Sequence, residues 1–264
     1  MDEQEKIADL ERRLKDAEKY LAEAGEIQRS ILPEASPYME GYDISAMMRP
    51  AKGVGGDFYD YIPVFSGPDT IGIFVGDVSD KGIPAALYMA MIHGMVHAGL
   101  SLKMDFTAEK FLVWLNLQLL EVSKGNMFVT LTYGVLDSKK HQFRYARAGH
   151  THPYVFDAEG MTIYCGEDSK PGQPLGILPN PSLDVNVIEL PRNSIMALYS
   201  DGLTDETNHL NRMFGMERLE RLIIKNRSSP SDEICSNIMD EMERYRHGTA
   251  PDDDCTIMII KREG

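Results

Sequence analysis

Four aspartates, each placed where the sequence predicts the end of a strand, constrain this chain more than any other feature. They are Asp57, Asp77, Asp201 and Asp253. Two of them follow apolar residues that alternate with period two, as one face of a strand does: Ile71, Ile73 and Val75 before Asp77, and Ile195, Ala197 and Tyr199 before Asp201. Buried carboxylates are costly unless a positive charge pairs with them. Oxygen ligands from distant points of a chain suit a hard cation such as Mg²⁺ or Mn²⁺, so a metal-dependent active site is the first hypothesis.

The charge balance of the chain narrows the classes of function. Its 264 residues carry a formal net charge of −14, which argues against a nucleic-acid binder because phosphate backbones require basic patches. A phosphorylated substrate would need a local positive field, which bound metal ions could supply. Cys165, Cys235 and Cys255 share no metal-type spacing and indicate reduced thiols. With no apolar run approaching a membrane span and no signal peptide, we expect a cytoplasmic protein without membrane insertion.

Residues 1–32 are predicted to form one helix with a heptad seam. The seam residues are Ile7, Leu10, Leu14, Ala17, Leu21, Ala24, Gln28 and Ile31. Flanking pairs of opposite charge, Lys6 with Glu11 and Arg13 with Glu18, favour a parallel homodimer, whereas the small seam residues weaken the coil. A solvated amphipathic helix that lies on its own domain fits the pattern equally well. We expect residues 1–36 to form a regulatory or dimerisation helix with its linker, and residues 37–264 to form one domain.

The rest of the chain reads as short strands interrupted by pairs of helices. Strands are predicted at 42–49, 57–64, 70–77, 127–136, 141–148, 153–157, 184–190, 194–200 and 255–261, and helices at about 82–100, 107–123, 215–226 and 230–246. Strands that follow one another directly, with helices inserted in pairs, favour antiparallel sheets flanked by helices over a parallel wound sheet. The expected class is therefore α+β.

The aspartate sites belong to a longer set of motifs. In chain order these are Ile27 to Pro33, Gly55-Gly56-Asp57-Phe58-Tyr59-Asp60, Gly76-Asp77-Val78-Ser79-Asp80-Lys81-Gly82, Ala148-Gly149-His150-Thr151-His152-Pro153, Pro174-Leu175-Gly176, Tyr199-Ser200-Asp201-Gly202 and Asp253-Asp254-Cys255-Thr256. On these residues the chain resembles the metal-dependent PPM-type (type 2C) serine/threonine protein phosphatases, in the bacterial SpoIIE/RsbU-like branch. The motifs are specific as a set, and they cover nearly everything but the first helix.

This resemblance implies a four-layer αββα sandwich with two Mg²⁺ or Mn²⁺ ions at one edge. By the matching motifs, Asp77 would bridge both ions and the Val78 carbonyl would help to hold the first. Asp57, Asp201 and Asp253 would complete the second, and the four aspartates are the expected catalytic set. Such a metal pair activates a shared water for direct attack on the phosphoryl group, so no covalent nucleophile is needed. Asp254 and Thr256 are expected to support the ligands rather than to bind metal.

The resemblance also implies partners. In this branch the usual substrate is a phosphorylated STAS-domain anti-anti-sigma factor, whose dephosphorylation frees a sigma factor in a partner-switching pathway. Relatives often carry a sensor domain upstream of a helix like residues 1–32, so an upstream sensor domain or a regulatory protein is a further expected partner.

The chain departs from the eukaryotic pattern at several positions. Those relatives carry Asp-Gly-His where this chain has Asp77-Val78-Ser79, so a histidine acid for the leaving group is missing. His150 is expected to stabilise a turn. Asp80 replaces the glycine usual in this branch and is expected to be an exposed loop residue. Arg49 and Lys52 are the nearest candidates for the phosphate-binding arginine of eukaryotic members.

Other readings of the motifs are weaker. His93 and His97 have the spacing of a zinc-binding helix, but Gly94 stands where the catalytic glutamate would be, and we favour a packed, partly buried helix face. Gly55-Gly56-Asp57 is similar to a diguanylate cyclase signature, although Phe58-Tyr59 replaces its Glu-Phe. Two rival functions stay open: another metal-dependent phosphoesterase, and a non-catalytic scaffold with the phosphatase fold.

Overall fold

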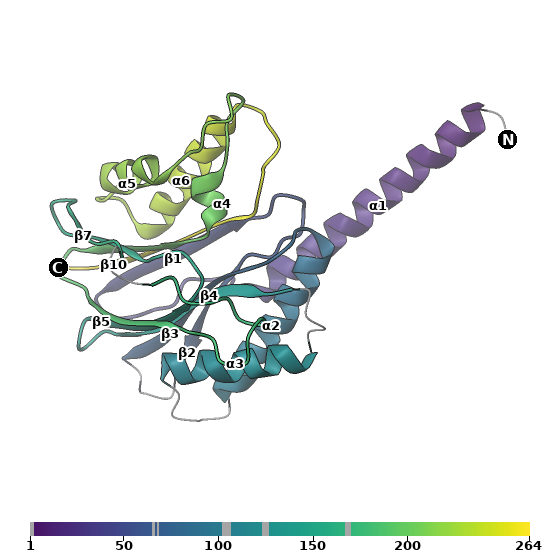
Figure 1. The fold of residues 1–264 in the computed structure, drawn as a ribbon. Coiled ribbons are helices and arrows are strands. Elements are labelled where there is room, and N and C mark those ends of the chain that lie inside the picture. Colours follow the sequence, from purple (N-terminus) through teal and green to yellow (C-terminus); the bar gives the residue numbers. More distant parts are fainter. Residues whose placement is uncertain (1–2, 65–66, 68, 102–106, 123–126, 167–169) are drawn as a thin grey trace.

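Two antiparallel sheets lie face to face at the centre of the molecule, and helices cover both outer surfaces (Figure 1). The structure is a computed structural model, and it describes all residues except 1–2, 65–66, 68, 102–106, 123–126 and 167–169. The first sheet has the order β1 (Tyr42–Arg49), β10 (Cys255–Arg262), β9 (Ile195–Tyr199), β6 (Tyr154–Phe156) and β7 (Thr162–Tyr164). The second has the order β2 (Phe58–Pro63), β3 (Thr70–Val78), β4 (Val129–Asp137), β5 (Gln142–Ala148) and β8 (Asp184–Glu189).

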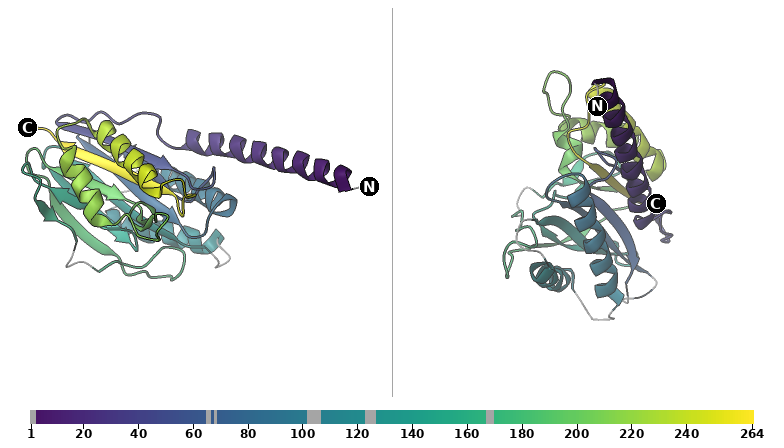
Figure 2. Two further views of the ribbon diagram at one scale, coloured as in Figure 1. Left: turned by 90° about the horizontal axis from the view of Figure 1, so that it is seen from above. Right: turned by 90° about the vertical axis from the view of Figure 1, so that its right-hand side faces the viewer.

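The helices complete the outer layers. They are α1 (Glu3–Ile31), α2 (Ile83–Ser101), α3 (Ala108–Val122), α4 (Asp201–Asp205), α5 (Met216–Lys225) and α6 (Ser231–Arg246). The second sheet packs against α2 and α3, and the first packs against α5 and α6 (Figures 1 and 2). The αββα sandwich expected from the sequence is confirmed. Sequence patterns missed β7 and α4, which have only 3 and 5 residues and so carry too little periodicity to recognise.

Successive side chains along each strand point to opposite faces of its sheet, one face packing on helices and the other on the opposite sheet. On the first sheet, Ala197 and Ile259 pack with α5 and α6, whereas their neighbours Leu198 and Ile260 belong to the cluster that includes the second sheet. On the second sheet, Phe74 faces α3: its ring stacks on Tyr133 at 4.2 Å between centroids and meets the edge of Phe111 at 5.8 Å. Side chains of opposite parity on β3, including Asp77, therefore face away from α3.

The α2 helix corrects one sequence expectation. Residues Ile83–Ser101 are long and apolar enough to cross a membrane by length and composition, although no such run was expected. In the structure the helix covers the second sheet, and Ala85, Met89 and Ile92 are fully buried. Its apolar character is accounted for by the core of the domain.

The N-terminal helix touches the domain only near its end and projects from it (Figures 1 and 2). Gly25 allows this contact, because a Cβ at that position would lie 2.4 Å from the Gly53 carbonyl oxygen. One turn later, the Gln28 amide donates to the Gly55 carbonyl at 2.6 Å and accepts from the Gly55 N–H at 2.9 Å. Upstream, Leu10 and Leu14 are each 61% exposed. The first half of the helix therefore does not lie on its own domain, and the second half is tied to the loop before Asp57.

A buried ion pair fixes the connection between β5 and β8. The Arg147 side chain is 1% exposed and contacts the Asp184 carboxylate at 3.0 Å. It also donates to the carbonyls of His150 at 2.7 Å and Lys170 at 2.9 Å, so one guanidinium joins three segments. Because removal of one partner leaves the other charge buried and uncompensated, this pair is costly to break.

We therefore expect Arg147→Leu to lower the free energy of unfolding by about 3–5 kcal/mol, measured by denaturant titration. Arg144→Leu, an exposed arginine on the same strand, is the matched control and should change it by less than about 0.5 kcal/mol. Adding Asp184→Leu to Arg147→Leu should recover part of the loss, since both charges are then absent. Equal costs for the two arginine variants would contradict this account.

Candidate metal centre

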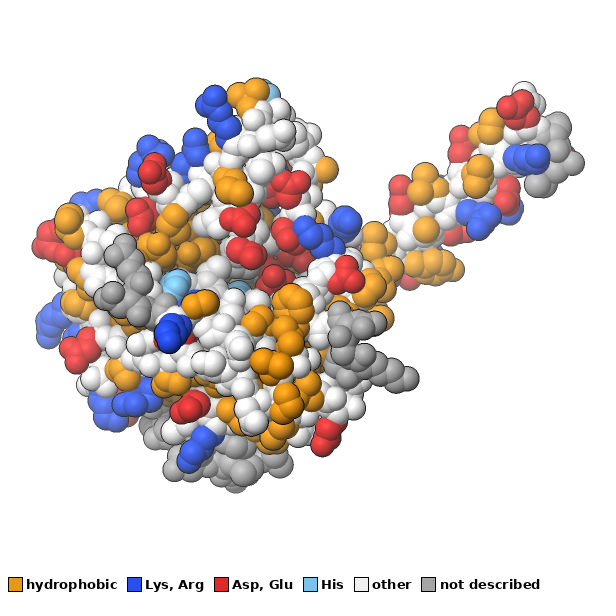
Figure 3. All heavy atoms as spheres, in the orientation of Figure 1, with side chains coloured by type: hydrophobic (Ala, Val, Ile, Leu, Met, Phe, Trp, Pro, Cys, Tyr) orange, Lys and Arg blue, Asp and Glu red, His pale blue; other side chains and the backbone are white. Residues whose placement is uncertain are grey.

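The four aspartates expected from the sequence come together at one edge of the sandwich. Asp57 precedes β2, Asp77 lies on β3, Asp201 begins α4, and Asp253 precedes β10. Figure 3 shows acidic side chains gathered around a hollow between the part formed by α4–α6 and the part that α2 covers. Asp201 requires a correction, because it does not continue the face of Tyr199. The strand ends at Tyr199, and the first turn of α4 carries Asp201 toward the cluster.

Asp57 is fixed by two hydroxyl groups from the opposite sheet. Its Oδ2 accepts from Ser200 Oγ at 2.6 Å and from Thr256 Oγ1 at 2.7 Å, and its side chain is almost fully buried. Burial raises the pKa of Asp57 well above its ordinary value, and the charges of Asp77 and Asp254 raise it further. The two hydrogen bonds act in the opposite direction but do not cancel the rise. The two hydrogen bonds therefore fix the position of the Asp57 carboxylate but do not neutralise its charge.

Asp77 has the same electrostatic problem at the centre of the group. Burial, followed by the charges of Asp201, Asp253 and Asp254, raises its pKa from 3.8 to about 7. Burial, together with Asp205 and Asp253, also raises the pKa of Asp201. Crowding of this kind favours the protonated carboxyl groups, and a cation among them would favour the ionised form.

Asp254 holds the loop that carries Asp57. Its Oδ1 accepts from the Ala51 N–H at 2.8 Å, and its Oδ2 accepts from the Gly56 N–H at 2.6 Å. Gly55 is required beside it, because a Cβ at that position would lie 2.1 Å from Asp254 Oδ2. Gly202 permits an equally close approach, since its Cβ would lie 2.0 Å from the Asp254 carbonyl oxygen. Asp254, which lies just before β10, thus ties down the segment before β2 because its carboxylate accepts hydrogen bonds from two backbone N–H groups there.

Lys81 is the functional candidate that sequence reasoning missed. Its ammonium lies 2.8 Å from Asp253 Oδ2 and donates to the Asp252 carbonyl at 2.6 Å. The only local signal was its place in the Asp77 motif. Arg49, in contrast, is held by Asp240 at 2.9 Å and Glu243 at 3.0 Å on α6, which engages its guanidinium away from a phosphate. Lys52 is exposed on the loop before Asp57.

Two further motif residues have structural explanations. Asp80 is exposed and has a φ of +81°, a left-handed conformation in which glycine is unstrained and aspartate is tolerated. His150 is buried, and its Nδ1 lies 2.9 Å from Thr130 Oγ1. Burial and then Arg147 lower the pKa of His150 to about 3, so its ring is neutral at physiological pH. A neutral His150 ring that bonds to Thr130 on β4 is consistent with the expected role of His150 in stabilising a turn.

The spacing of the carboxylates limits how they could share one ion. Oxygen ligands of one Mg²⁺ lie about 2.1 Å from it, and therefore within about 4.2 Å of one another. Among the described residues, no three of these aspartate side chains offer oxygens within 4.8 Å of one another. As they lie in the structure, these carboxylates do not bring three ligand oxygens around one common point. The Val78 carbonyl oxygen faces the same loop, since a Cβ on Gly56 would lie 2.7 Å from it.

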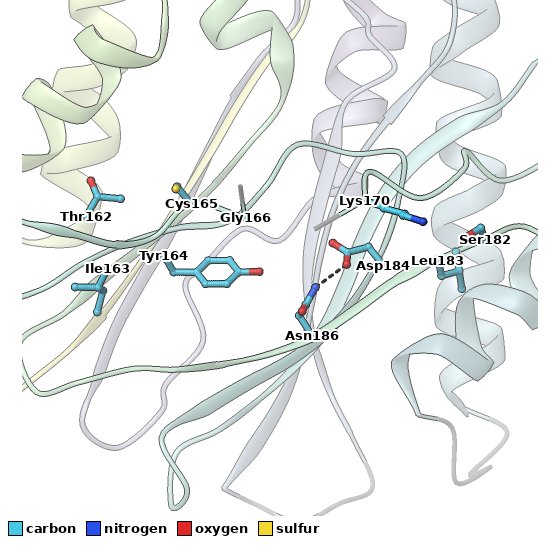
Figure 4. Close-up of a pocket in the computed structure, with 10 residues that line it drawn as sticks. All are labelled: Thr162, Ile163, Tyr164, Cys165, Gly166, Lys170, Ser182, Leu183, Asp184 and Asn186. Carbon is cyan, nitrogen blue, oxygen red and sulfur yellow. Dashed lines mark hydrogen bonds between the residues drawn. The ribbon is translucent and has the colours of Figure 1, made fainter. Parts of the chain in front are cut away.

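A second hollow does not offer this chemistry. It lies between β7 and β8, has a volume of about 520 Å³, and is lined by Tyr164, Lys170 and Asp184 among others (Figure 4). Its carboxylate is already engaged, because Asp184 pairs with Arg147 and accepts from Asn186 Nδ2 at 2.6 Å. The aspartate cluster is therefore the better candidate for the active site.

Comparison with known proteins places this arrangement in a family. A sequence profile described as stage II sporulation protein E (SpoIIE) matches residues 67–263. The chain belongs to the SpoIIE family. Its domain is of the PP2C phosphatase type, which confirms the resemblance seen in the motifs. The matched region includes Asp77, Asp201 and Asp253, while Asp57 lies upstream of it.

Individual relatives of this SpoIIE-family chain cover most of its length. Phosphoserine phosphatase RsbU of Bacillus subtilis is 31% identical over 241 residues, which span 91% of this chain and 69% of RsbU. Protein IcfG of Synechocystis sp. is 27% identical over 267 residues, which span 92% of this chain but only 41% of IcfG. The solved SiaA-PP2C domain of Pseudomonas aeruginosa shares the fold, with a TM-score of 0.75 at 21% identity over 94% of this chain and 98% of that domain.

Proposed function

We propose that this chain is a cytoplasmic, metal-dependent phosphatase that removes phosphate from serine or threonine on a partner protein. The observation that carries the proposal is the group of crowded carboxylates around Asp77, of which Asp57 is buried and Asp77 half-buried. Burial and mutual repulsion raise the pKa values of Asp57, Asp77 and Asp201. Such a costly arrangement makes sense when cations occupy it. A scaffold without catalytic function would have no reason to crowd these charges together. The family of the chain supports the reaction class.

The residues present fit a pair of Mg²⁺ or Mn²⁺ ions. Asp57, Asp77, Asp201 and Asp253, together with the Val78 carbonyl, are the groups that would hold these ions. Bound ions of this kind lower the pKa of water and neutralise phosphoryl oxygens. The chain itself supplies rigidity: Ser200 and Thr256 orient Asp57, and Asp254 fixes the loop on which it lies. Lys81 holds Asp253 in place and brings one positive charge to the rim.

The proposed substrate is a phosphorylated STAS-domain protein, an anti-anti-sigma factor in a bacterial partner-switching pathway. The support is the likeness to RsbU and the motifs that this chain has in common with that branch. The charge of the chain is consistent with a folded substrate, since a net charge of −14 offers little to a bare phosphopeptide.

The test of this function compares phosphate release from three kinds of substrate in the presence of Mn²⁺. A phosphoserine-bearing STAS protein should be hydrolysed with a catalytic efficiency at least about 10²-fold above that of p-nitrophenyl phosphate, because surface contacts position it. A cyclic dinucleotide and a nucleoside triphosphate should not be turned over. Comparable efficiency on the protein and the small ester would contradict substrate recognition by a surface. Faster turnover of a nucleotide would instead favour the rival phosphoesterase class.

We further propose that the projecting half of α1 associates with a second copy of the chain in parallel. Ile7 is 52% exposed and Leu10 and Leu14 are 61% exposed, and they form a seam that the domain leaves uncovered. The other end of the helix holds the Gly55 backbone, two residues before Asp57. Dimerisation and the metal centre are therefore physically connected, which suits a regulatory role for this helix.

Leu10→Asp combined with Leu14→Asp should shift the chain toward monomer by at least about tenfold in the dimer dissociation constant, because charges would enter the seam. These residues are preferable to Leu21, whose side chain adjoins Gly53 of the domain. Sedimentation and phosphatase turnover should be measured on the same samples. The exposed charge reversal Glu23→Lys, away from the seam, serves as the control. Unchanged association would leave residues 3–24 as a passive surface helix.

A further inference from the structure

A second group of potential metal ligands lies on the other face of β2, against α2. Asp60 comes from β2, and His93 and His97 come from successive turns of α2. Asp60 Oδ2 lies 2.8 Å from His93 Nε2 and 2.6 Å from His97 Nε2. The three ligand atoms lie within 4.8 Å of one another, and this is the one group of at least three such donors found among the described residues.

The three side chains lie close together, and a hydrogen bond fixes the orientation of the carboxylate among them. Asp60 Oδ1 accepts from the Tyr61 N–H at 2.6 Å, which turns Oδ2 toward the two imidazoles. The His93 ring is buried, with 8% of the residue exposed, and its Nε2 makes no aligned hydrogen bond despite its closeness to Asp60. A metal ion that accepts the lone pair of this nitrogen would give it an aligned partner.

The access and the ligand types indicate which ion would fit. The His97 side chain is 48% exposed, so the group opens to solvent on one side. Two imidazoles and one carboxylate are the ligands of a borderline transition metal and differ from the all-oxygen set at Asp77. His93 and His97 follow the i, i+4 spacing that places two nitrogens on one helix face, and Asp60 supplies the third ligand that the linear sequence did not reveal.

We propose that Asp60, His93 and His97 bind a transition-metal ion of the Zn²⁺ class, with solvent completing the coordination. The site is separate from the aspartate cluster, because Asp60 points to α2 whereas Asp77 points away from the helical layer. It links β2 to the second half of α2. The residue that would act as a base in a zinc hydrolase is glycine at position 94, so the role is to hold these two elements together rather than to catalyse.

The experiment titrates the full chain with Zn²⁺, and in parallel with Co²⁺, in saturating Mg²⁺. Calorimetry should give one Zn²⁺ site per chain, Co²⁺ should produce visible d–d absorption, and Zn²⁺ should raise the thermal midpoint. His97→Ala removes an exposed ligand and should weaken binding by at least about tenfold, because even supporting residues of metal sites are worth that much. Asp60→Asn should act in the same direction. His209→Ala, an exposed histidine elsewhere, is the control and should bind as the parent does.

Asp77→Asn distinguishes this site from the proposed catalytic one. The variant should retain the Co²⁺ absorption and the Zn²⁺-induced rise in the midpoint, and it should do so whether or not the chain is a phosphatase. Binding that disappears in Asp77→Asn, or that is equal in the parent and in His97→Ala, would overturn the proposal.

Discussion

Asp77→Asn is expected to lower phosphatase turnover by about 10³-fold or more at saturating Mn²⁺, equivalent to about 4 kcal/mol of transition-state stabilisation. The substitution preserves the shape of the side chain but removes its negative charge. That charge interacts electrostatically with Asp57, Asp201, Asp253 and Asp254. No other side chain in the group can replace it, because each is fixed by its own loop or helix. Turnover should be measured on the phosphoprotein across a range of Mn²⁺ concentrations.

Asp80→Asn is the matched control for this experiment. It makes the same chemical change three residues away, on an exposed side chain whose positive φ asparagine also tolerates. Its turnover should stay within about twofold of the parent, an energy difference of about 0.4 kcal/mol. Near-normal turnover of Asp77→Asn at saturating metal would show that Asp77 is not a ligand.

Asp77→Asn should have a higher free energy of unfolding than the parent protein when metal is absent. The folded-state pKa of Asp77 is about 7, above its ordinary value of 3.8, so folding favours the protonated carboxyl. The resulting stability is fully present below about pH 4 and is lost as the pH rises through 7. At pH 8 the metal-free parent therefore carries a destabilising charge that the variant lacks, and the difference should be on the order of 1–3 kcal/mol. Denaturant titration in chelator would detect it.

Removal of divalent cations is expected to abolish activity completely and reversibly. Excess chelator should reduce phosphate release to background, and added Mn²⁺ should restore it, with Mn²⁺ the better activator over Mg²⁺. The cause is the carboxylate group itself, since like charges at this density hold no phosphoryl group unless cations lie between them. Full turnover in excess chelator would rule out the proposed reaction.

The metal requirement should also depend on pH in a definite direction. Because protons and cations compete for Asp77, the apparent metal affinity should weaken as the pH falls below about 7, where the carboxyl becomes protonated. The concentration of Mn²⁺ that gives half-maximal activity, measured between pH 6 and 8, should therefore decrease as pH rises. A constant value over this range would show that Asp77 is already ionised before metal binds.

Much of the fold was predictable because its signals are local. The alternation of Ile71, Ile73 and Val75 identifies β3 and the face on which Asp77 lies, and helical periodicity identifies α5 and α6. The turn chemistry around Gly55 marks the loop that carries Asp57. These features depend on residues close in sequence, so one sequence is enough to recognise them.

The remaining features depend on contacts between distant segments. Nothing near Lys81 indicates that its ammonium meets Asp253, and nothing near His93 indicates that Asp60 lies opposite. Arg49 was a reasonable candidate for phosphate until α6 supplied Asp240 and Glu243 as partners. Asp201 was assigned to a strand face because the pattern before it is regular, whereas the backbone changes to a helix after Tyr199. Tertiary contacts decide such cases.

The pairing of β1 with β10 sets the order in which the protein becomes functional during its synthesis. Tyr42 pairs with Arg262 and Arg49 pairs with Cys255. The β1 strand therefore cannot form this pairing until β10, more than 200 residues later in the chain, has been synthesised. Thr256 on that late strand also holds Asp57. A nascent chain that ends before β10 carries Asp57, Asp77 and Asp201 without the segment that brings them into register. A ribosome-bound chain whose β10 has not yet emerged therefore lacks the contacts that would assemble the proposed metal centre.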